Sequence, residues 1–341
     1  MDETLTGYRD GVSPPLKSAI QKAARRLLPF LLLLYILAFI DRVNVGYAKQ
    51  ALMRTTGLSE AVYAFGASIF FIGYALFEVP SNLILHRVGA RVWMCRIMVT
   101  WGLISAAMMF TTSAATFYLL RFLLGVAEAG FFPGVILYLT YWFPARNRGP
   151  MMGLFYFGAP LAQIIGGPLS GLLLDMDGMG NLHGWQWMFL VEGLMASVVG
   201  VWTFRYLTDR PAEAKWLTES ERRALQATLD AEETEKATHG ARNFLSLLRH
   251  PRILYFGLIY CLIQMSVYGV TFYLPSQVAR LLGRETGLVV GAVSAIPWAC
   301  ALVAAFAVPR LVGRFGSRQR IAAGALAMAG LGIAVSSTPW T

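Results

Sequence analysis

The chain has 341 residues, of which 56% are hydrophobic and 14% charged, whereas a soluble domain carries about 25% charged residues. So large an apolar fraction cannot be enclosed in one soluble core, and a soluble globular fold is therefore excluded. The net charge of +10 does not indicate a nucleic-acid-binding protein, because the basic residues stand between hydrophobic runs and not on one polar face. Composition predicts an all-α integral membrane protein surrounded by the lipid bilayer.

Six long apolar runs follow a polar N-terminal segment, residues 1–26. Several of them exceed the roughly 18 residues that favour a transmembrane helix over a buried one. The first run is too long for a signal-peptide core and no small-residue cleavage site follows it, so we expect this helix to be retained. Residues 27–207 are therefore predicted to form one unit of six helices, near Leu27–Ala48, Ala61–Leu85, Val92–Thr112, Thr116–Phe143, Pro150–Leu174 and Gln186–Leu207.

A polar stretch, residues 208–253, separates this unit from the rest of the chain. Its Glu-rich and Ala-rich part favours an amphipathic helix on a cytoplasmic linker, and a tether with no role beyond connection is the alternative. Residues 254–341 then hold three more predicted helices, near Leu254–Leu274, Gly287–Val308 and Ile321–Ser337.

Lys and Arg collect on one side of the predicted helices, which marks that side as cytoplasmic. The N-terminus and the polar stretch both lie on it. Lys49, Arg54, Arg280 and Arg284 are exceptions, too few to reverse the assignment. Arg is used far more than Lys, which favours a GC-rich bacterial source, and we expect a multi-pass protein of the cell (inner) membrane. The basic residues on the cytoplasmic side include Arg25, Arg26, Arg87, Arg91, Arg146, Arg148, Arg310, Arg314, Arg318 and Arg320.

One short loop occurs twice. Arg87-Val88-Gly89-Ala90-Arg91 recurs 227 residues later as Arg314-Phe315-Gly316-Ser317-Arg318, and the same offset carries the first predicted helix onto the seventh. Two tandem units of the same orientation are therefore expected, related by an axis along the membrane normal. The second unit has three of its six expected helices, so we predict that the sequence is truncated.

The repeated Arg-x-Gly-x-Arg loop resembles the loop signature of the major facilitator superfamily, with His86 and Gly313 where that signature usually has an acidic residue. Further motifs resemble the anion:cation symporter family within it, and together they span nearly the whole chain. These motifs are Asp41-Arg42-Val43-Asn44, Phe77-Glu78-Val79-Pro80-Ser81-Asn82, the run from Arg121 to Gly134, Trp142-Phe143-Pro144-Ala145-Arg146 and the linker from Asp209 to Leu217.

The resemblance implies a bundle of the major-facilitator type that takes up sugar acids, dicarboxylates or aromatic carboxylates with protons, or in some relatives with sodium. It implies no cofactor. Family positions suggest that Tyr74, Gln163 and Gln264 contact the substrate, although hydrogen bonding between helices would also explain them. Gating or structural roles are expected for Asn44, Glu78, Arg87, Gly89, Arg91, Arg314, Gly316 and Arg318.

Four charged residues lie deep in predicted helices: Asp41, Arg42, Arg121 and Glu128. Charges at this depth are costly and usually face a cavity or a partner. Arginine stays charged and can grip a carboxylate with two hydrogen bonds, so Arg42 and Arg121 are predicted to bind the anion. Asp41 and Glu128 are predicted to carry the coupling proton, because a desolvated carboxylate accepts one readily. A static salt-bridge network is the alternative.

Other classes of function find less support. The four histidines fall in loops or at helix ends, and no His-Glu-x-x-His or Gly-x-Ser-x-Gly motif is present, so an enzyme is not expected. The three cysteines have no pairing or metal-ligand spacing. An efflux antiporter of the same superfamily and a nontransporting sensor on the same fold stay open as alternatives.

Overall fold

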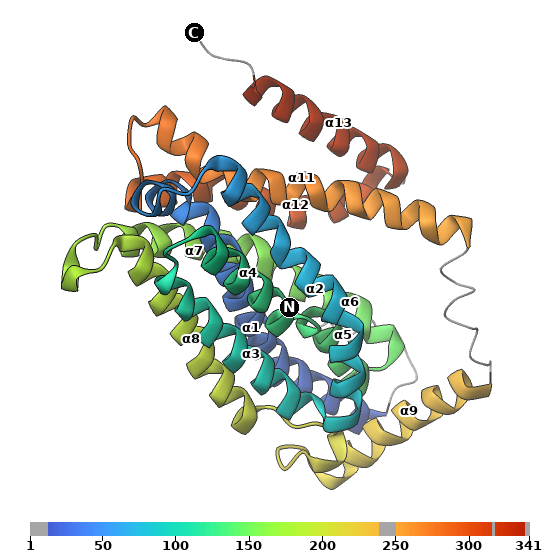
Figure 1. Ribbon diagram of the computed structural model, residues 1–341. Coiled ribbons are helices and arrows are strands. Elements are labelled where there is room, and N and C mark those ends of the chain that lie inside the picture. Colours follow the sequence, from blue (N-terminus) through green and yellow to red (C-terminus); the bar gives the residue numbers. More distant parts are fainter. Residues whose placement is uncertain (1–12, 239–249, 316–317, 338–341) are drawn as a thin grey trace.

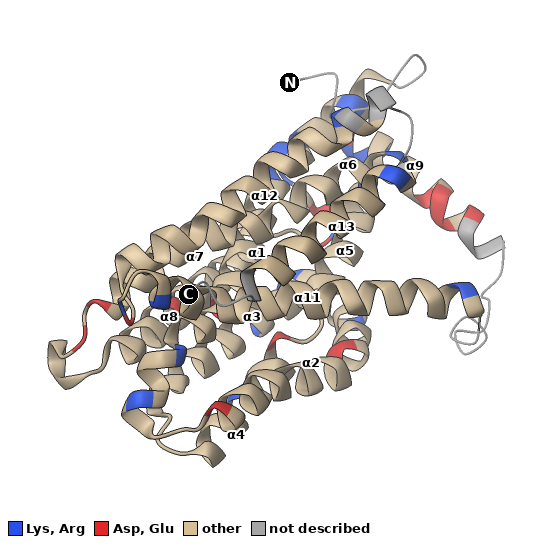
Figure 2. Cartoon of the chain, turned by 90° about the horizontal axis from the view of Figure 1, so that it is seen from above, with Lys and Arg blue, Asp and Glu red and all other residues tan. Residues whose placement is uncertain are grey.

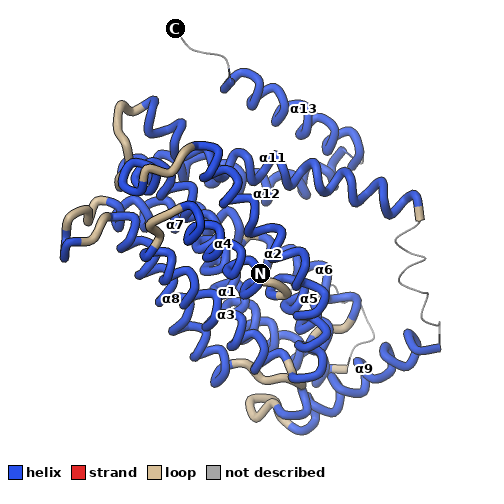
Figure 3. Tube along the Cα trace, viewed as in Figure 1, coloured by secondary structure: helices blue, strands red, loops and turns tan. Residues whose placement is uncertain are grey.

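A computed structural model describes residues 13–238, 250–315 and 318–337, and every regular element in these ranges is a helix (Figure 3). Eight helical spans in the described residues are long and apolar enough to cross a membrane. The prediction of an all-α membrane protein is confirmed. The helices are α1 (Pro14–Thr56), α2 (Glu60–Val88), α3 (Ala90–Ala107), α4 (Ala114–Glu128), α5 (Phe131–Trp142), α6 (Ala145–Tyr156), α7 (Gly158–Leu174), α8 (Gly184–Tyr206), α9 (Glu219–Thr238), α11 (Pro251–Leu281), α12 (Leu288–Phe315) and α13 (Arg318–Ser337).

The distribution of charge fits a membrane setting. Figure 2 shows long stretches of helix without a Lys, Arg, Asp or Glu, with most charged residues near helix ends and in α9. The last predicted span forms α13, whose apolar part, Gln319–Val335, is shorter than the other membrane spans. This helix stands away from the bundle of the earlier helices (Figure 1).

Two of the predicted spans are broken in the middle. Residues 116–143 were expected to lie in one continuous helix, but α4 ends at Glu128 and α5 begins at Phe131. Gly130 between them adopts a left-handed conformation (φ 85°), which glycine tolerates and most other residues do not. The fifth span is likewise divided into α6 and α7 at Phe157. The first break places Glu128 at the end of a half-helix within the bundle.

Helix α1 begins at Pro14, well before the predicted start at Leu27. The added turns pack on α9, the amphipathic helix predicted in the linker. Lys22 lies 2.8 Å from Glu221 of α9, and the Ser18 hydroxyl donates to the same carboxylate at 2.6 Å. Burial alone would raise the pKa of Glu221, but the hydrogen bonds from Lys22 and Ser18 outweigh it and lower that pKa to about 2. Helix α9 of the linker is therefore held against the first six spans.

The repeated loop forms a tight turn between α2 and α3. Gly89 has a positive φ of 97°, and a Cβ atom there would lie 3.1 Å from the Asp209 carboxylate. Asp209, which comes from the linker, accepts a hydrogen bond of 2.8 Å from the backbone N–H of Arg91. The position where the family usually has an acid holds His86, and the linker supplies a carboxylate to the turn instead.

The second copy of the loop joins α12, which ends at Phe315, to α13, which begins at Arg318. Its place between two helices matches that of the first copy. Gly316 lies outside the described residues, and so do the side chains of Arg314 and Arg318.

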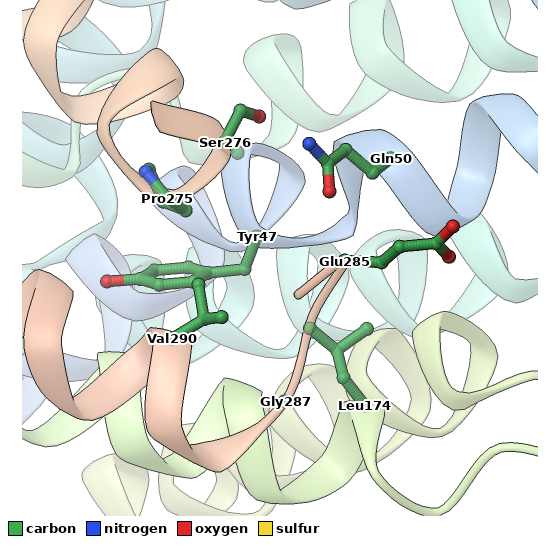
Figure 4. Close-up of a pocket in the computed structure, with 9 residues that line it drawn as sticks. Tyr47, Gln50, Leu174, Pro275, Ser276, Glu285, Gly287 and Val290 are labelled. Carbon is green, nitrogen blue, oxygen red and sulfur yellow. The ribbon is translucent and has the colours of Figure 1, made fainter. Parts of the chain in front are cut away.

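Helices α11 and α12 meet the first six spans at the end that we predict to face outward. Glycine backbones make this contact close: a Cβ atom on Gly291 of α12 would lie 2.0 Å from the carbonyl oxygen of Gly167 in α7. Asp175 also accepts a hydrogen bond of 2.9 Å from the backbone N–H of Leu288. The gap left here is about 10 Å³, room for about one water molecule. Figure 4 shows its walls, which include Tyr47, Gln50, Leu174, Pro275, Ser276, Gly287 and Val290.

Candidate functional site

A cavity of about 370 Å³ lies between the first six spans and helices α11 and α12. Its volume falls in the range of small-molecule sites, roughly 300–1,000 Å³. Most of its wall is aromatic, with a few polar groups directed into it, as is typical of such sites. The lining residues are Tyr35, Phe39, Arg42, Phe70, Phe71, Tyr74, Glu78, Phe132, Tyr156, Ala159, Gln163, Tyr260, Gln264, Val267, Tyr268, Thr271 and Trp298.

Four of the five residues predicted to bind the substrate line this one cavity. Arg42 comes from α1, Tyr74 from α2, Gln163 from α7 and Gln264 from α11. The structure thus brings together side chains that lie up to 222 residues apart in the sequence, 264 minus 42. Their shared surface is a candidate binding site, and their individual roles stay predictions.

Arg42 is the cation in the cavity wall. Its guanidinium forms an ion pair with Glu128, which lies at the end of α4. A second nitrogen of the same guanidinium donates a 2.7 Å hydrogen bond to the Tyr268 hydroxyl of α11. The ring of Tyr74 lies 5.2 Å from the guanidinium carbon, a distance at which an aromatic ring attracts a cation. Arg42 therefore links the two parts of the chain that face each other across the cavity.

Arg121 lies behind the cavity wall and is fully buried. Its guanidinium carbon stacks 4.9 Å above the Phe70 ring, and its Nε donates to the Gly66 carbonyl at 3.4 Å. Both of its Nη atoms are buried with no hydrogen-bond partner among the described residues. In this conformation the side chain does not line the cavity, unlike Arg42.

Asp41 and Glu128, the two predicted proton carriers, occupy different surroundings. Glu128 is paired with Arg42, as described above. Asp41 faces a different side of α1, toward α3, and accepts hydrogen bonds from Trp101 at 2.6 Å and from Ser105 at 2.8 Å. The two neighbouring residues Asp41 and Arg42 therefore do not form an ion pair with each other.

The residues with predicted gating or structural roles are spread over the molecule. Glu78 lines the cavity and Asn44 lies beside Asp41. Arg87 is exposed at the end of α2, and the Arg91 guanidinium stacks on Phe204 of α8. Within the described residues, no group of three His, Cys, Asp or Glu side chains is placed to hold a metal ion.

Tyr268 was not predicted from the sequence as a partner of Arg42. Trp101 and Ser105 were not predicted either, and Glu192 was not assigned to a site although it is buried. Trp101 and Ser105 are four residues apart, a spacing that places them on one face of α3. That spacing is a usable signal, but it does not tell which helix the face meets.

Comparison with known proteins identifies the family. The chain matches the model described as Major Facilitator Superfamily over residues 31–341. It is 46% identical to the inner membrane transport protein RhmT of Escherichia coli K12, over 94% of this chain and 74% of that protein. A relative from Agrobacterium vitis named "Putative tartrate transporter" is 45% identical over 94% of this chain and 71% of its own length. A quinolone resistance transporter of Acinetobacter baumannii is 43% identical over 89% of this chain and 69% of its own length.

Solved structures give the same fold. A bacterial homologue of the human lysosomal transporter Spinster, in an inward-facing and occupied conformation, superposes with a TM-score of 0.60 at 22% identity. The match covers 86% of this chain and 60% of that one, so the chain spans less than two thirds of that structure.

The family match and the two relatives at 45% and 46% identity agree with the motifs in α1, α2 and α4. These relatives are transporters, which confirms the prediction that the chain is not an enzyme. The chain belongs to the major facilitator superfamily of membrane transporters and, within it, to the anion:cation symporter type.

Proposed function

We propose that this protein takes up a small organic anion together with protons. The observation that carries the proposal is the Arg42 guanidinium in the wall of the 370 Å³ cavity, held there by Glu128 and Tyr268. A planar guanidinium matches a carboxylate with two parallel hydrogen bonds. An entering carboxylate competes with Glu128 for this cation.

The competition supplies a reason for coupling. In the state described here Arg42 neutralises Glu128. When a substrate carboxylate takes over Arg42, Glu128 is left buried without its cation, and an unpaired charge in such surroundings is strongly disfavoured. Binding a proton removes that charge. Substrate binding therefore favours proton binding, as symport requires.

Arg121 also supports the proposal that the substrate is an anion. Among the described residues the Arg121 Nη atoms have no hydrogen-bond acceptor, and a buried cation in this situation attracts an anion. Its guanidinium contacts the Phe70 ring and the carbonyl of Gly66. We propose that Arg121 holds the second half of the anion site when α4 shifts toward the cavity.

The substrate class rests on the wall chemistry together with one relative's name. The wall combines one arginine with aromatic rings and the amides of Gln163 and Gln264, a set that suits a carboxylate bearing hydroxyl groups or a ring. The name of the Agrobacterium vitis relative refers to tartrate, a hydroxylated dicarboxylate. Tartrate, gluconate, succinate and benzoate therefore form a suitable test panel.

The experiment measures binding of each radiolabelled panel anion to the purified protein. Arg42→Gln is expected to weaken binding by about 2–5 kcal/mol, the cost of removing one partner of a buried charge pair, which is roughly 30-fold or more. Arg42→Lys should restore binding only in part, because an ammonium keeps the charge but loses the planar geometry.

Arg96→Gln is the matched control. Arg96 is also an arginine within a membrane span, but it stacks on Trp93 at 4.5 Å and does not line the cavity. Affinity should stay unchanged in this variant. Equal affinity of the Arg42→Gln and Arg96→Gln proteins for every anion that binds would refute the proposed anion site.

Efflux by proton antiport is the second candidate, and one relative favours it. The Acinetobacter baumannii relative is named for quinolone resistance, and the aromatic wall of the cavity would also accommodate a planar ring system. Antiport moves protons opposite to the substrate, whereas symport moves both in the same direction. The direction of proton movement therefore separates the two candidates.

A further inference from the structure

Behind the cavity, two carboxylates share one asparagine. The Asn44 amide nitrogen lies 3.4 Å from an oxygen of Asp41 and 3.1 Å from an oxygen of Glu192 in α8. Ser170 of α7 donates to the other Glu192 oxygen at 2.7 Å. Asp41, Asn44, Glu192 and Ser170 are each at most 1% exposed. Three transmembrane spans thus meet at this polar cluster.

The cluster contains no cation among the described residues. Neither Asp41 nor Glu192 forms an ion pair with a described Lys or Arg, and all the groups that donate to them are neutral: Trp101, Ser105, Asn44 and Ser170. Two negative charges this close together in a buried site repel each other strongly, and carboxylate pairs elsewhere resolve the conflict by sharing one proton.

Among the described residues, the helices packed around the pair contribute no positive charge to it. Helix α3 contributes Trp101 and Ser105, and α7 contributes Ser170, none of which is charged. The ionisable groups that act electrostatically on the pair are Glu128 of α4, on Asp41, and Tyr47 of α1, on Glu192. Glu128 adds negative charge, which increases the need for a proton.

We propose that Asp41 and Glu192 form one proton-binding site bridged by Asn44, and that this pair holds the coupling proton while Glu128 is paired with Arg42. The proposal deepens the proposed symport and rests on it. The proton enters from the outer solution, forms an O–H bond with one carboxylate oxygen, and leaves to water on the inner side when that bond breaks. No other bond is made or broken.

The hydrogen bonds indicate which carboxylate carries the proton. Asp41 accepts from three donors, Trp101, Ser105 and Asn44, which suits the ionised form. The Ser170 hydroxyl beside Glu192 can rotate and become an acceptor, because a hydroxyl both donates and accepts. The proton therefore resides on the Glu192 oxygen that faces Ser170.

The pair is also placed to communicate with the cavity. Asp41 and Arg42 are consecutive on α1 and point about 100° apart, so a rotation of this helix moves both. A change in the contacts of Arg42 thereby alters the hydrogen bonds that Asp41 receives. Glu192 is a positioning and proton-holding residue in this arrangement, since it does not line the cavity.

The first test uses protons alone as the probe. Infrared difference spectra of the protein in lipid, recorded at neutral pH, should contain the C=O absorption of a protonated carboxyl group, which exposed carboxylates do not give at this pH. Glu192→Gln should remove this band. Glu60→Gln, a control at a mostly exposed carboxylate, should leave it unchanged. A band that survives Glu192→Gln overturns the proposal, and so does a band that sodium but not potassium removes, since the pair would then bind sodium.

Glu192→Asp covers the case in which the glutamine variant fails to fold. The shorter side chain keeps a carboxyl group but alters its contact with Ser170, so the frequency of the band should shift. A band identical to that of the unaltered protein would show that it arises elsewhere and would refute the assignment.

The second test separates this proposal from the proposed function. In proteoliposomes, Glu192→Gln should retain exchange of the panel anion that binds best and lose pH-driven accumulation of it. Parallel loss of exchange and accumulation, with the protein folded, would indicate a purely structural residue and refute the proposal. If no panel anion is transported while the infrared band behaves as expected, the proposed function fails and the proton site stands.

Discussion

The close contact between α7 and α12 at the outer end predicts that adding one methyl group, as in Gly291→Ala, forces the two helices apart. Gly291→Ala places a Cβ atom 2.0 Å from the carbonyl oxygen of Gly167, where ordinary contact begins at about 3.4 Å. The obstacle is backbone, so it cannot turn aside as a side chain would. The two helices must separate by more than about 1 Å, which destabilises the state in which the outer end is closed.

The size of the effect follows from the cost of overpacking, about 1–3 kcal/mol in a well-packed core. We infer that the protein alternates between this state, closed at the outer end, and an outward-open state that lacks the contact, so that the whole cost shifts the equilibrium toward the outward-open state. At 1.4 kcal/mol per factor of ten, the shift is roughly 5-fold to 150-fold. Gly291→Leu should shift the equilibrium further.

Cysteine labelling measures the shift. Ser276→Cys, in a background whose three native cysteines are serine, puts a thiol in the wall of the closed gap. An impermeant maleimide added outside should label it faster in the Gly291→Ala protein. Gly269→Ala in α11 is the matched control, because no atom lies within 4 Å of the added Cβ atom. Equal labelling rates in the Gly291 and Gly269 variants would refute the proposed closure of the outer end.

Three further predictions concern the cytoplasmic side. Cysteines at Ser13 and Thr234 should be labelled only from inside cells, and labelling of either from outside would reverse the topology. The contact between α1 and α9 should be fully present above about pH 4.3, the ordinary pKa of glutamate, and should be lost as the pH falls toward the lowered Glu221 pKa of about 2. Glu221→Gln should accelerate tryptic cleavage of α9 at neutral pH, and unchanged cleavage would contradict the contact. Trp216→Ala removes a ring stacked 5.2 Å from Trp142 and should lower thermal stability, with about 0.5–1.5 kcal/mol lost beyond the buried area; an unchanged melting temperature would contradict this.

Much of the fold could be predicted from hydropathy and charge. Each of the first six predicted spans coincides with a helical span of the structure, because an apolar run of membrane length has few alternatives to a helix. The break at Gly130 was missed, because glycine is common in unbroken membrane helices and its φ angle depends on the packing around it. The extension of α1 to Pro14 was missed because α9, and not lipid, covers it.

The candidate site was predicted less evenly. Arg42, Tyr74, Gln163 and Gln264 were predicted to bind the substrate, and they line the cavity, whereas Arg121, predicted with them, does not. The pairing of Asp41 with Glu192 through Asn44 could not be foreseen, because hydropathy does not determine how each helix is rotated about its axis. Motif residues identify one face of a helix, but the neighbouring helix that packs against this face is decided by tertiary packing.

Proton movement in proteoliposomes tests the central claim most directly. A gradient of the panel anion that binds best is applied across vesicles of low buffering capacity, with no initial pH difference, and the external pH is followed with an indicator. Symport predicts that the external solution becomes alkaline as the anion enters, and that Arg42→Gln abolishes this change. Acidification of the external solution on anion entry, or anion entry with no pH change, would contradict proton-coupled symport.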